Sequence, residues 1–288
     1  MTADRRIPGV VNRRGPVGPP LPLVFDSPHS GNTLPQDFQP SAPSSLLRLS
    51  EDFQIDQLYA AAPEHGAVLV AAEFPRIYID PNRNARDIDP ALLDGDWPDA
   101  LAPTGKSRLG VGLIWRLIGP KVPIYSAPLP VVAVQRRLQD YYLPYHAEVQ
   151  SALDRAHHQF GAAWHINCHS MPSIASPQSA DAGRARPDFT ISDRDGSTCE
   201  IGFLDCVVET LRGLGYDVRV NDPYKGDELI RRHGRPGEAR HSLQIEVNRR
   251  LYMDEVRIEP NGGFNRLQQD VTRLIAAVAA YVSDRLHL

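Results

Sequence analysis

The alternation of apolar and polar positions along the chain predicts short strands separated by helices. Apolar, β-branched runs bounded by Pro, Gly, Asn or Asp are typical of buried strands. Such runs occur at 21–25, 66–72, 76–79, 122–125, 163–168, 188–192, 217–220 and 242–247. Apolar residues three and four positions apart predict helices over 51–63, 199–213, 263–287 and 130–160, the last interrupted near Pro144. This succession of strands and helices is typical of an α/β fold.

Two stretches do not share this pattern. Residues 1–20 are rich in Gly and Pro, which favour irregular loops over helices and strands. We therefore predict an irregular N-terminal arm over 1–20 and a single α/β domain over 21–288. Residues 87–112, with many Asp, Pro and Gly, are predicted to form a loop that acts as a lid or rim.

The composition is that of an ordinary globular protein, with 42% hydrophobic and 23% charged residues among 288. The formal net charge is -4 with both signs interleaved, which argues against a nucleic-acid-binding surface. No apolar run reaches the ~18 residues of a membrane span. The N-terminus lacks the apolar segment of a secretory signal. The three cysteines form no CxxC pair, so we expect a cytoplasmic protein without disulfides.

Two histidines follow predicted strands, each within a His-Ser step. His29 lies in the loop 26–31 after the first strand, and His169 directly follows the strand 163–168. In open α/β sheets, ligands sit beyond the carboxyl ends of strands. A histidine there suits a metal ligand or a general base, and two such loops in one sheet bring two imidazoles together. The alternative for His29 is a turn that happens to contain a histidine.

Carboxylates occupy two positions that invite a functional interpretation. Glu51 and Asp52 begin the predicted helix 51–63, where acidic residues suit the helix dipole. The alternative is that one of them shares a metal ion with His29. Glu246 lies inside the predicted strand 242–247, where a carboxylate is expensive to bury unless it is paired or used.

Arginines and aromatic residues supply candidates for substrate contacts. Arg76 and Arg83 flank a predicted strand and a tight loop, and Asn82 precedes the second of them. Arginine suits the planar recognition of carboxylates, although most arginines are solvated surface residues. A Tyr, His and Arg cluster over 136–146 either lines a pocket or packs in the core.

Together these residues offer every part of a metal-dependent hydrolase. Two histidines and one carboxylate are a common set of catalytic zinc ligands that leaves a position for water. A carboxylate free of the metal serves as general base, and an arginine stabilises a developing oxyanion. A metal-free serine hydrolase is disfavoured because neither Ser30 nor Ser170 lies in a GxSxG sequence.

Seven short motifs carry a resemblance to a known family. In chain order they are SPHSG, EDFQIDQLY, RIYIDPNR, YYLPYH, CHSM, YKG and LQIEVNRRLYM. They span about residues 21–280 and resemble the N-formylglutamate amidohydrolase family. The resemblance implies a phosphorylase/hydrolase-like α/β fold, related to the zinc carboxypeptidases and aspartoacylase-like enzymes. In that fold a single mixed, twisted sheet lies between helices on both faces.

The resemblance also implies a set of metal ligands. His29 and His169 would be the zinc imidazoles, with Asp52 as the carboxylate ligand and Glu51 as its alternative. Zinc carboxypeptidases take their carboxylate ligand from a Glu three residues after the first His. Asn32 occupies that position here, so the anionic ligand must come from elsewhere in the chain.

Further roles follow from the same resemblance. Arg76 would polarise the scissile carbonyl, Asn82 and Arg83 would hold a substrate carboxylate, and Glu246 would be the general base. Asn167 stands two residues before the second histidine, where the family often has Asp. A neutral partner orients an imidazole less strongly than a carboxylate does.

The implied reaction is zinc-dependent hydrolysis of a small N-acyl amino acid, namely N-formyl-L-glutamate to formate and glutamate. Candidates for the far end of the substrate are Arg136, Arg137, His146, Tyr224 and Lys225. The alternatives are a related zinc deacylase, amidase or carboxypeptidase-like enzyme, or a non-catalytic binding member of the fold. Neither a nucleic-acid partner nor a membrane partner is expected.

Overall fold

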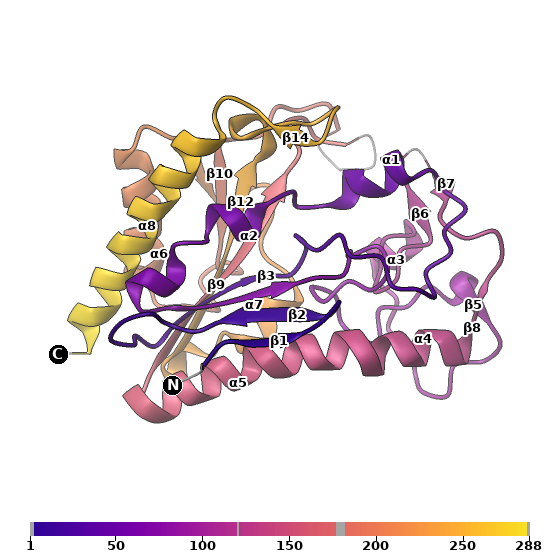
Figure 1. Cartoon of the computed structure of the whole chain (residues 1–288), viewed down its shortest axis with the longest axis horizontal. Coiled ribbons are helices and arrows are strands. Elements are labelled where there is room, and N and C mark those ends of the chain that lie inside the picture. Colours follow the sequence, from indigo (N-terminus) through magenta and orange to yellow (C-terminus); the bar gives the residue numbers. More distant parts are fainter. Residues whose placement is uncertain (1–2, 120, 177–181, 287–288) are drawn as a thin grey trace.

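The computed structural model describes residues 3–119, 121–176 and 182–286, and its central element is an eight-stranded sheet (Figure 1). Strands β4, β3, β9 and β12 are parallel, whereas β2 and β10 run antiparallel to their inner neighbours. The predicted α/β class with a mixed sheet is confirmed. In spatial order the strands are β1 (Arg5–Ile7), β2 (Val11–Arg14), β4 (Val68–Ala72), β3 (Leu23–Ser27), β9 (Ala163–Met171), β12 (Arg240–Asn248), β10 (Phe189–Ser192) and β11 (Val218–Val220).

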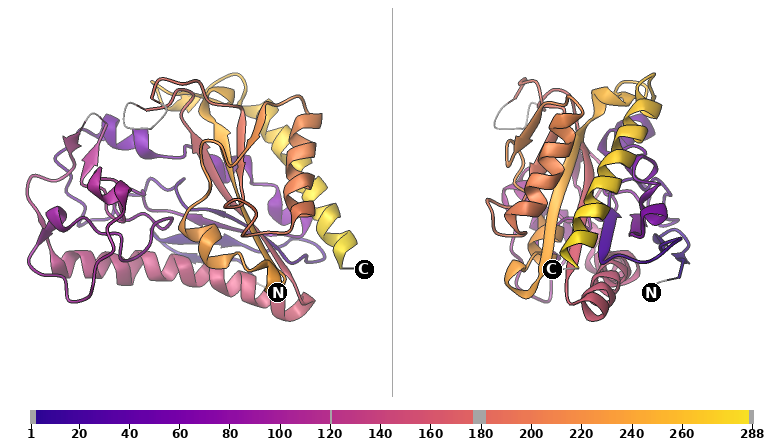
Figure 2. Two further views of the ribbon diagram at one scale, coloured as in Figure 1. Left: turned by 180° about the vertical axis from the view of Figure 1, so that it is seen from behind. Right: turned by 90° about the vertical axis from the view of Figure 1, so that its left-hand side faces the viewer.

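Helices cover both faces of the sheet, as predicted. One apolar core contains α2 (Ile55–Leu58), α6 (Ile201–Gly213) and α8 (Phe264–Arg285), of which α6 and α8 lie side by side (Figure 2). The other core contains α4 (Val131–Arg137), α5 (Leu143–Phe160) and α7 (Glu228–His233). The sheet is thus the middle layer of three.

The two-residue period of the strands gives the sheet two unlike faces. On β12, Leu243, Ile245 and Val247 belong to the core under α6 and α8. Gln244 and Glu246 alternate with them and point to the opposite side, where they line a cavity. Polar chemistry is therefore collected on one face, with the apolar core behind it.

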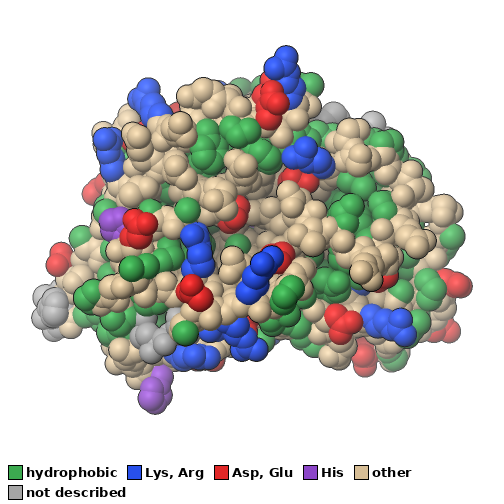
Figure 3. All heavy atoms as spheres, viewed as in Figure 1, with side chains coloured by type: hydrophobic (Ala, Val, Ile, Leu, Met, Phe, Trp, Pro, Cys, Tyr) green, Lys and Arg blue, Asp and Glu red, His purple; other side chains and the backbone are tan. Residues whose placement is uncertain are grey.

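Shorter elements lie around these layers. They are α1 (Ser44–Leu47), α3 (Gly105–Arg108), the 3-10 turns Arg48–Ser50, Ala62–His65, Pro90–Leu92, Pro236–Glu238 and Arg249–Leu251, and the strand pairs β5 (Leu93–Asp94) with β8 (Leu129–Pro130), β6 (Leu117–Ile118) with β7 (Val122–Pro123), and β13 (Met253–Asp254) with β14 (Glu259–Pro260). Basic and acidic side chains are interspersed on the face drawn in Figure 3. Within the described ranges, no helix combines the length and the apolarity that crossing a membrane requires.

The prediction of an irregular arm over 1–20 is wrong for the stretch that forms β1 and β2. These strands make an antiparallel hairpin, and β2 extends the sheet by pairing with β4. Arg13 on β2 donates to the buried carboxylate of Glu148 on α5 at 2.5 Å. Charged residues are common on edge strands, which they protect from pairing with other chains. The polar composition of this stretch therefore did not indicate the two strands.

Two other predicted elements differ from the structure. The predicted helix 51–63 is reduced to α2 and one 3-10 turn, and Gln54 before α2 has a left-handed conformation with a φ of 50°. The predicted strand 76–79 is a turn instead. Its residues Ile77, Tyr78 and Ile79 are buried in the core without sheet pairing. Their apolar character reflects burial rather than strand structure.

The predicted helix over 130–160 is present as α4 and α5, which are joined by a π-helical turn at Leu138–Tyr142. The interruption falls next to Pro144, as predicted, because proline has no N–H to donate to the preceding turn. At the end of the turn, the Tyr142 hydroxyl donates to the Arg83 carbonyl at 2.9 Å. The helix therefore holds the loop that carries several candidate site residues.

Candidate metal centre and active site

The carboxyl ends of β3, β9 and β12 open onto a cavity of about 840 Å³. Parallel strands bring their following loops to the same edge, so residues far apart in sequence meet there. Most residues predicted for the site line this cavity: His29, Asp52, Arg76, Asn82, Arg83, His169, Tyr224, Lys225 and Glu246. The ring centroids of His29 and His169 are 4.7 Å apart, so the two His-Ser steps do bring two imidazoles together.

Three buried residues form a compact group of potential metal ligands. Asp52 Oδ2 lies 3.2 Å from His29 Nδ1 and 3.0 Å from His169 Nδ1. One ligand atom from each residue lies within 4.8 Å of the other two. The second Asp52 oxygen accepts hydrogen bonds from Ser170 Oγ at 3.1 Å and Arg249 Nη2 at 3.2 Å. Oδ2 is therefore the oxygen left facing the imidazoles.

Asp52, rather than Glu51, faces the histidines. The Asp52 backbone N–H donates to the His29 carbonyl at 3.0 Å, which ties the two loops together. The Glu51 carboxylate instead pairs with Arg48 at 3.4 Å. Because α2 begins at Ile55, neither carboxylate lies in its first turn. The helix-dipole explanation for these two residues does not apply.

Hydrogen bonds to the outer imidazole nitrogens orient both histidines. His29 Nε2 lies 2.7 Å from Asp80 Oδ1, and His169 Nε2 lies 2.6 Å from Asn167 Oδ1. These oxygens accept, so each contact is a hydrogen bond when Nε2 carries the proton, and a neutral imidazole in that tautomer presents the lone pair of Nδ1. The two lone pairs and Asp52 Oδ2 converge on one place. Three such donor atoms with oriented imidazoles fit a divalent metal ion.

The electrostatics of the group favour the protonation states that bind metal. Burial alone would raise the pKa of Asp52, but the adjacent imidazoles of His169 and His29 hold it well below its usual range. Burial lowers the pKa of His169, against the opposing effect of Asp52. A deprotonated carboxylate and a neutral imidazole are the forms that bind metal ions.

Asp80 connects the metal group to an arginine. One of its oxygens accepts from His29, and the other accepts from Arg76 Nη2 at 2.8 Å and Arg76 Nε at 3.1 Å. The Arg76 guanidinium carbon also lies 5.0 Å from the Trp115 ring centroid. Burial would raise the pKa of Asp80, but the charges of Arg76, His29 and Arg83 hold it well below its usual range. Arg76 is thus fixed on the cavity wall beside the metal ligands.

Glu246 stands next to the metal group in the sheet. It pairs with His169 across β9 and β12, and its Oε1 accepts from Gln244 Nε2 at 2.8 Å. Burial and the nearby charge of Asp52 raise the pKa of Glu246 to about 8, although Arg76 and other cations oppose this. A carboxyl group with a pKa near the working pH is suited to general acid–base chemistry.

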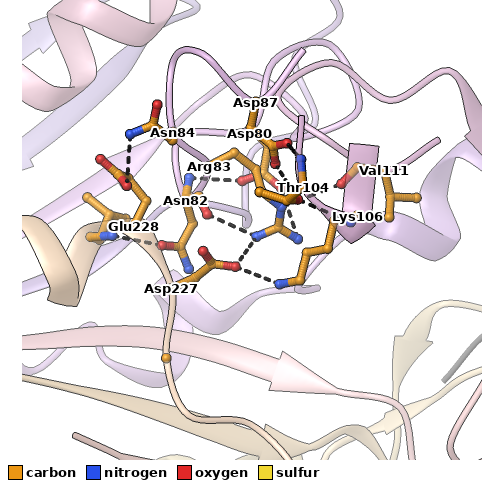
Figure 4. A network of polar contacts seen from close by, with 12 residues as sticks. Asp80, Asn82, Arg83, Asn84, Asp87, Thr104, Lys106, Val111, Asp227 and Glu228 are labelled. Carbon is orange, nitrogen blue, oxygen red and sulfur yellow. Dashed lines mark hydrogen bonds and ion pairs between the residues drawn. The ribbon is translucent and has the colours of Figure 1, made fainter. Parts of the chain in front are cut away.

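Arg83 belongs to a network of polar contacts that also lines the cavity (Figure 4). Its Nη1 donates to Asp227 Oδ2 at 2.8 Å, and Lys106 Nζ donates to the same oxygen at 2.6 Å. Asn82 Oδ1 accepts from the Leu229 backbone N–H at 2.9 Å, which fixes the start of α7. Arg83 and Lys106 therefore share the Asp227 carboxylate.

Three residues predicted to contact substrate do not line this cavity. Arg136 is exposed on α4. Arg137 is buried elsewhere, where it donates to the Tyr78 carbonyl at 3.0 Å. His146 donates from Nε2 to the Pro81 carbonyl at 2.9 Å, and burial lowers its pKa to about 3. The prediction is corrected accordingly, because Arg137 and His146 support the loop that carries Asn82 and Arg83.

The sequence reasoning also missed residues that line the cavity. Lys106 lies in the four-residue helix α3, and Asp227 and Trp115 lie in irregular segments, so no periodic pattern marked these residues. Arg249 follows Glu246 by three residues at the end of β12. Arg249 thus follows a strand end, as the two histidines do, and the same argument marks it as a site residue.

The fold and the site together define a class of protein. It is a mixed α/β protein with two histidines and one carboxylate at the strand ends, beside a buried glutamate and two arginines. A family model described as N-formylglutamate amidohydrolase matches residues 21–253. The chain belongs to the N-formylglutamate amidohydrolase family.

Individual relatives agree with this assignment. The chain is 29% identical over 254 residues to an N-formylglutamate deformylase of Pseudomonas putida, with 82% of this chain and 83% of that protein covered. It is 28% identical over 243 residues to the N-formylglutamate deformylase of Pseudomonas aeruginosa, with the same coverage of 82% and 83%. A crystal structure of the N-formylglutamate amidohydrolase from Ralstonia eutropha superposes with a TM-score of 0.91 at 49% identity, covering 96% of this chain and 99% of that one.

Proposed function

We propose that this protein is a zinc-dependent amidohydrolase that converts N-formyl-L-glutamate and water to formate and L-glutamate. The observation that carries the proposal is the convergence of His29 Nδ1, His169 Nδ1 and Asp52 Oδ2 beside Glu246 and Arg76. The N-formylglutamate deformylases of the two Pseudomonas species suggest the substrate. The three cysteines are free, which supports a reducing compartment, and we place the enzyme in the cytoplasm.

The metal would be held by the two imidazoles and Asp52. When bound there, Zn²⁺ supplies a lowered pKa for water and polarisation of a carbonyl oxygen. The chain itself contributes the orientation of the ligands, through Asp80 for His29 and through Asn167 for His169. Preset ligand orientations keep the donor atoms aimed at one point.

The arginines hold the substrate on either side of its scissile bond. Arg83 lies on the cavity wall, with Nη1 paired to Asp227 and Nη2 4.0 Å from Asp80, and we assign the substrate α-carboxylate to it. Asn82 faces the same space and holds α7 in place. Arg76 donates to the formyl oxygen as negative charge develops on it.

Glu246 handles the protons. It takes a proton from the attacking water and delivers it to the leaving amine of glutamate. A pKa raised to about 8 makes the carboxylate a stronger base than an exposed glutamate. Its hydrogen bond from Gln244 holds one oxygen, which leaves the other for the water.

A glutamate substrate also presents a γ-carboxylate, which needs a cation in the outer cavity. Lys106 is the first candidate because it shares Asp227 with Arg83 and half of its side chain is exposed. Lys225 and Tyr224 also line the cavity, but the Lys225 ammonium is paired with Asp195 at 2.8 Å. We therefore assign the γ-carboxylate to Lys106.

The test combines metal analysis with product release. Purified protein is analysed for bound elements, and formate release from N-formyl-L-glutamate is then followed with and without a chelator. We expect about one zinc per chain and chelator-sensitive formate release that returns when zinc is added. Zinc without formate release contradicts the substrate and directs a panel of other N-acyl amino acids. Protein that binds no metal even after reconstitution contradicts the proposal and favours a non-catalytic member of the fold.

A further inference from the structure

A line of buried hydrogen bonds leads away from the proposed metal site into the sheet. His169 Nε2 lies 2.6 Å from Asn167 Oδ1, and Asn167 Nδ2 donates to Asp26 Oδ1 at 2.8 Å. Asp26 on β3 and Asn167 on β9 are register partners, so the contact is built into the strand pairing. Asp26 and Asn167 are fully buried and His169 is 2% exposed, so bulk water does not compete for these groups.

The Asp26 carboxylate fixes which way the Asn167 amide points. An ionised carboxylate only accepts hydrogen bonds, so the amide NH₂ group must face it. Burial would raise the pKa of Asp26, but hydrogen bonds from His165, Tyr145 and Asn167 hold it below its ordinary value. A flipped Asn167 would bring its oxygen against Asp26 Oδ1, and two buried acceptors would then face each other.

The orientation of Asn167 in turn fixes a proton on His169. With the amide oxygen 2.6 Å from Nε2, this contact is a hydrogen bond only in the tautomer that carries the hydrogen on Nε2. A competing arrangement exists, because Asn82 Nδ2 lies 3.1 Å from the same nitrogen and is a donor. That arrangement would leave Nε2 bare and put the proton on Nδ1, facing Asp52 Oδ2 at 3.0 Å. The proton would then occupy the lone pair that a metal ion needs.

We propose that Asp26 is a positioning residue of the metal centre. By holding the Asn167 amide, it keeps the His169 proton on Nε2 and leaves Nδ1 free for the metal. The link to metal binding rests on the proposed function, whereas the position of the proton does not. The Asp80 carboxylate orients His29 directly, through its contact with Nε2. The two imidazoles are thus set by one carboxylate in contact and one acting through an amide.

The first measurement reads the proton directly. Long-range ¹H–¹⁵N correlation spectra of metal-free protein labelled at histidine report whether His169 Nε2 is protonated. We expect a protonated Nε2 in the unaltered protein, with or without a second proton on Nδ1. A bare Nε2 overturns the proposal without the need for any variant.

Variants then test the chain of contacts. In Asp26→Asn the ionic acceptor is lost, so we expect a second His169 population with a bare Nε2 and metal affinity about 10–100-fold lower. Asn167→Asp places two carboxylates together and should weaken folding. The double variant D26N/N167D restores one acid and one amide in exchanged positions. It should recover the Nε2 proton and the metal affinity.

Tyr145→Phe is the matched control. The Tyr145 hydroxyl donates to Asp26 Oδ2 at 2.5 Å, on the oxygen that Asn167 does not use. Its loss should lower the thermal midpoint of unfolding while leaving the His169 proton and the metal affinity unchanged. If Asp26→Asn keeps both the Nε2 proton and the metal affinity, the proposal is overturned. If the proton responds to Asp26→Asn but no variant or parent binds zinc, the positioning role stands and the proposed function falls.

Discussion

Two His–Asp groups lie on the same face of the sheet, four residues apart along β9, and they have opposite surroundings. Around His165, both imidazole nitrogens have protein partners: Nε2 with Asp26 at 2.8 Å and Nδ1 with Ser242 Oγ at 2.7 Å. Around His169, one nitrogen is held by Asn167, while Nδ1 faces Asp52 with His29 beside it. Both ring nitrogens of His165 are thus occupied inside the protein. The Nδ1 atoms of His169 and His29 instead face Asp52 at the edge of a cavity.

The difference teaches that residue type does not separate a structural histidine from a functional one. Both groups contain a fully buried aspartate, and both lie on strands of the same parallel core. The two histidines differ in their position along β9. His165 sits near the amino end of β9, where neighbours surround it, whereas His169 sits near the carboxyl end, beside the cavity.

Exchanging the two histidines for alanine gives the sharpest test of this difference. His169→Ala removes a metal ligand, so formate release should fall at least 10³-fold, to background, with a small change in stability. His165→Ala removes one of the three side-chain partners of the buried Asp26 carboxylate and should cost about 3–5 kcal/mol of unfolding free energy. Metal analysis, formate assays and urea unfolding of both variants check this. Equal effects of the two variants on metal content would break the comparison.

Glu246→Gln separates chemistry from metal binding within the cavity group. The amide keeps the shape and the contact with Gln244 but cannot take a proton. We expect kcat to fall by about 10²–10⁴-fold, with zinc content and KM nearly unchanged. Loss of zinc in this variant would instead make Glu246 a ligand.

Lys106→Met tests how far the functional region reaches into the outer cavity. Losing a charge-assisted hydrogen bond to the γ-carboxylate should raise KM for N-formyl-L-glutamate about 10–100-fold. N-formyl-L-alanine, which has no second carboxylate, should be turned over equally well by variant and parent. Lys225→Met is the matched control, and a larger effect of that variant would move the γ-carboxylate site to Lys225.

A buried histidine should make the stability of the protein depend on pH, without a direct effect on catalysis. Burial lowers the pKa of His146 to about 3, against 6.5 for the ordinary side chain. At a pH between these two pKa values, His146 is protonated in the unfolded chain and neutral in the folded chain. Stability is therefore complete above pH 6.5 and declines as the pH falls, by up to about 1.4 kcal/mol per pH unit for this residue. His146→Gln should flatten the decline in urea unfolding between pH 6.5 and 4.5, and an unchanged slope would contradict this.

Much of the site was predictable because it follows the strands. Apolar runs precede His29 and His169 and enclose Glu246, and parallel pairing brings these positions together. Choosing Asp52 over Glu51 needed the family resemblance, because both carboxylates fit the start of a helix that is not there. The structure supplied the reason for the choice in the backbone contact between Asp52 and His29.

The remainder could not be predicted because it depends on contacts between irregular segments. Arg83 meets Asp227 across 144 positions and Lys106 meets it across 121, and neither segment has a period to read. The apolar stretch 76–79 was misassigned for a related reason. Burial and strand pairing both favour apolar residues, so the sequence of this stretch does not distinguish a buried turn from a paired strand.

The π-helical turn at Leu138–Tyr142 has a consequence for how the chain tolerates changes in length. A π turn holds one residue more than the α turn it replaces, because its hydrogen bonds span five positions instead of four. Removing one residue there would give a continuous α-helix whose two halves keep their orientation. Adding one elsewhere in α5 would rotate Tyr145 and His146 off their partners. Single-residue gaps between homologous chains are therefore expected to gather at this turn.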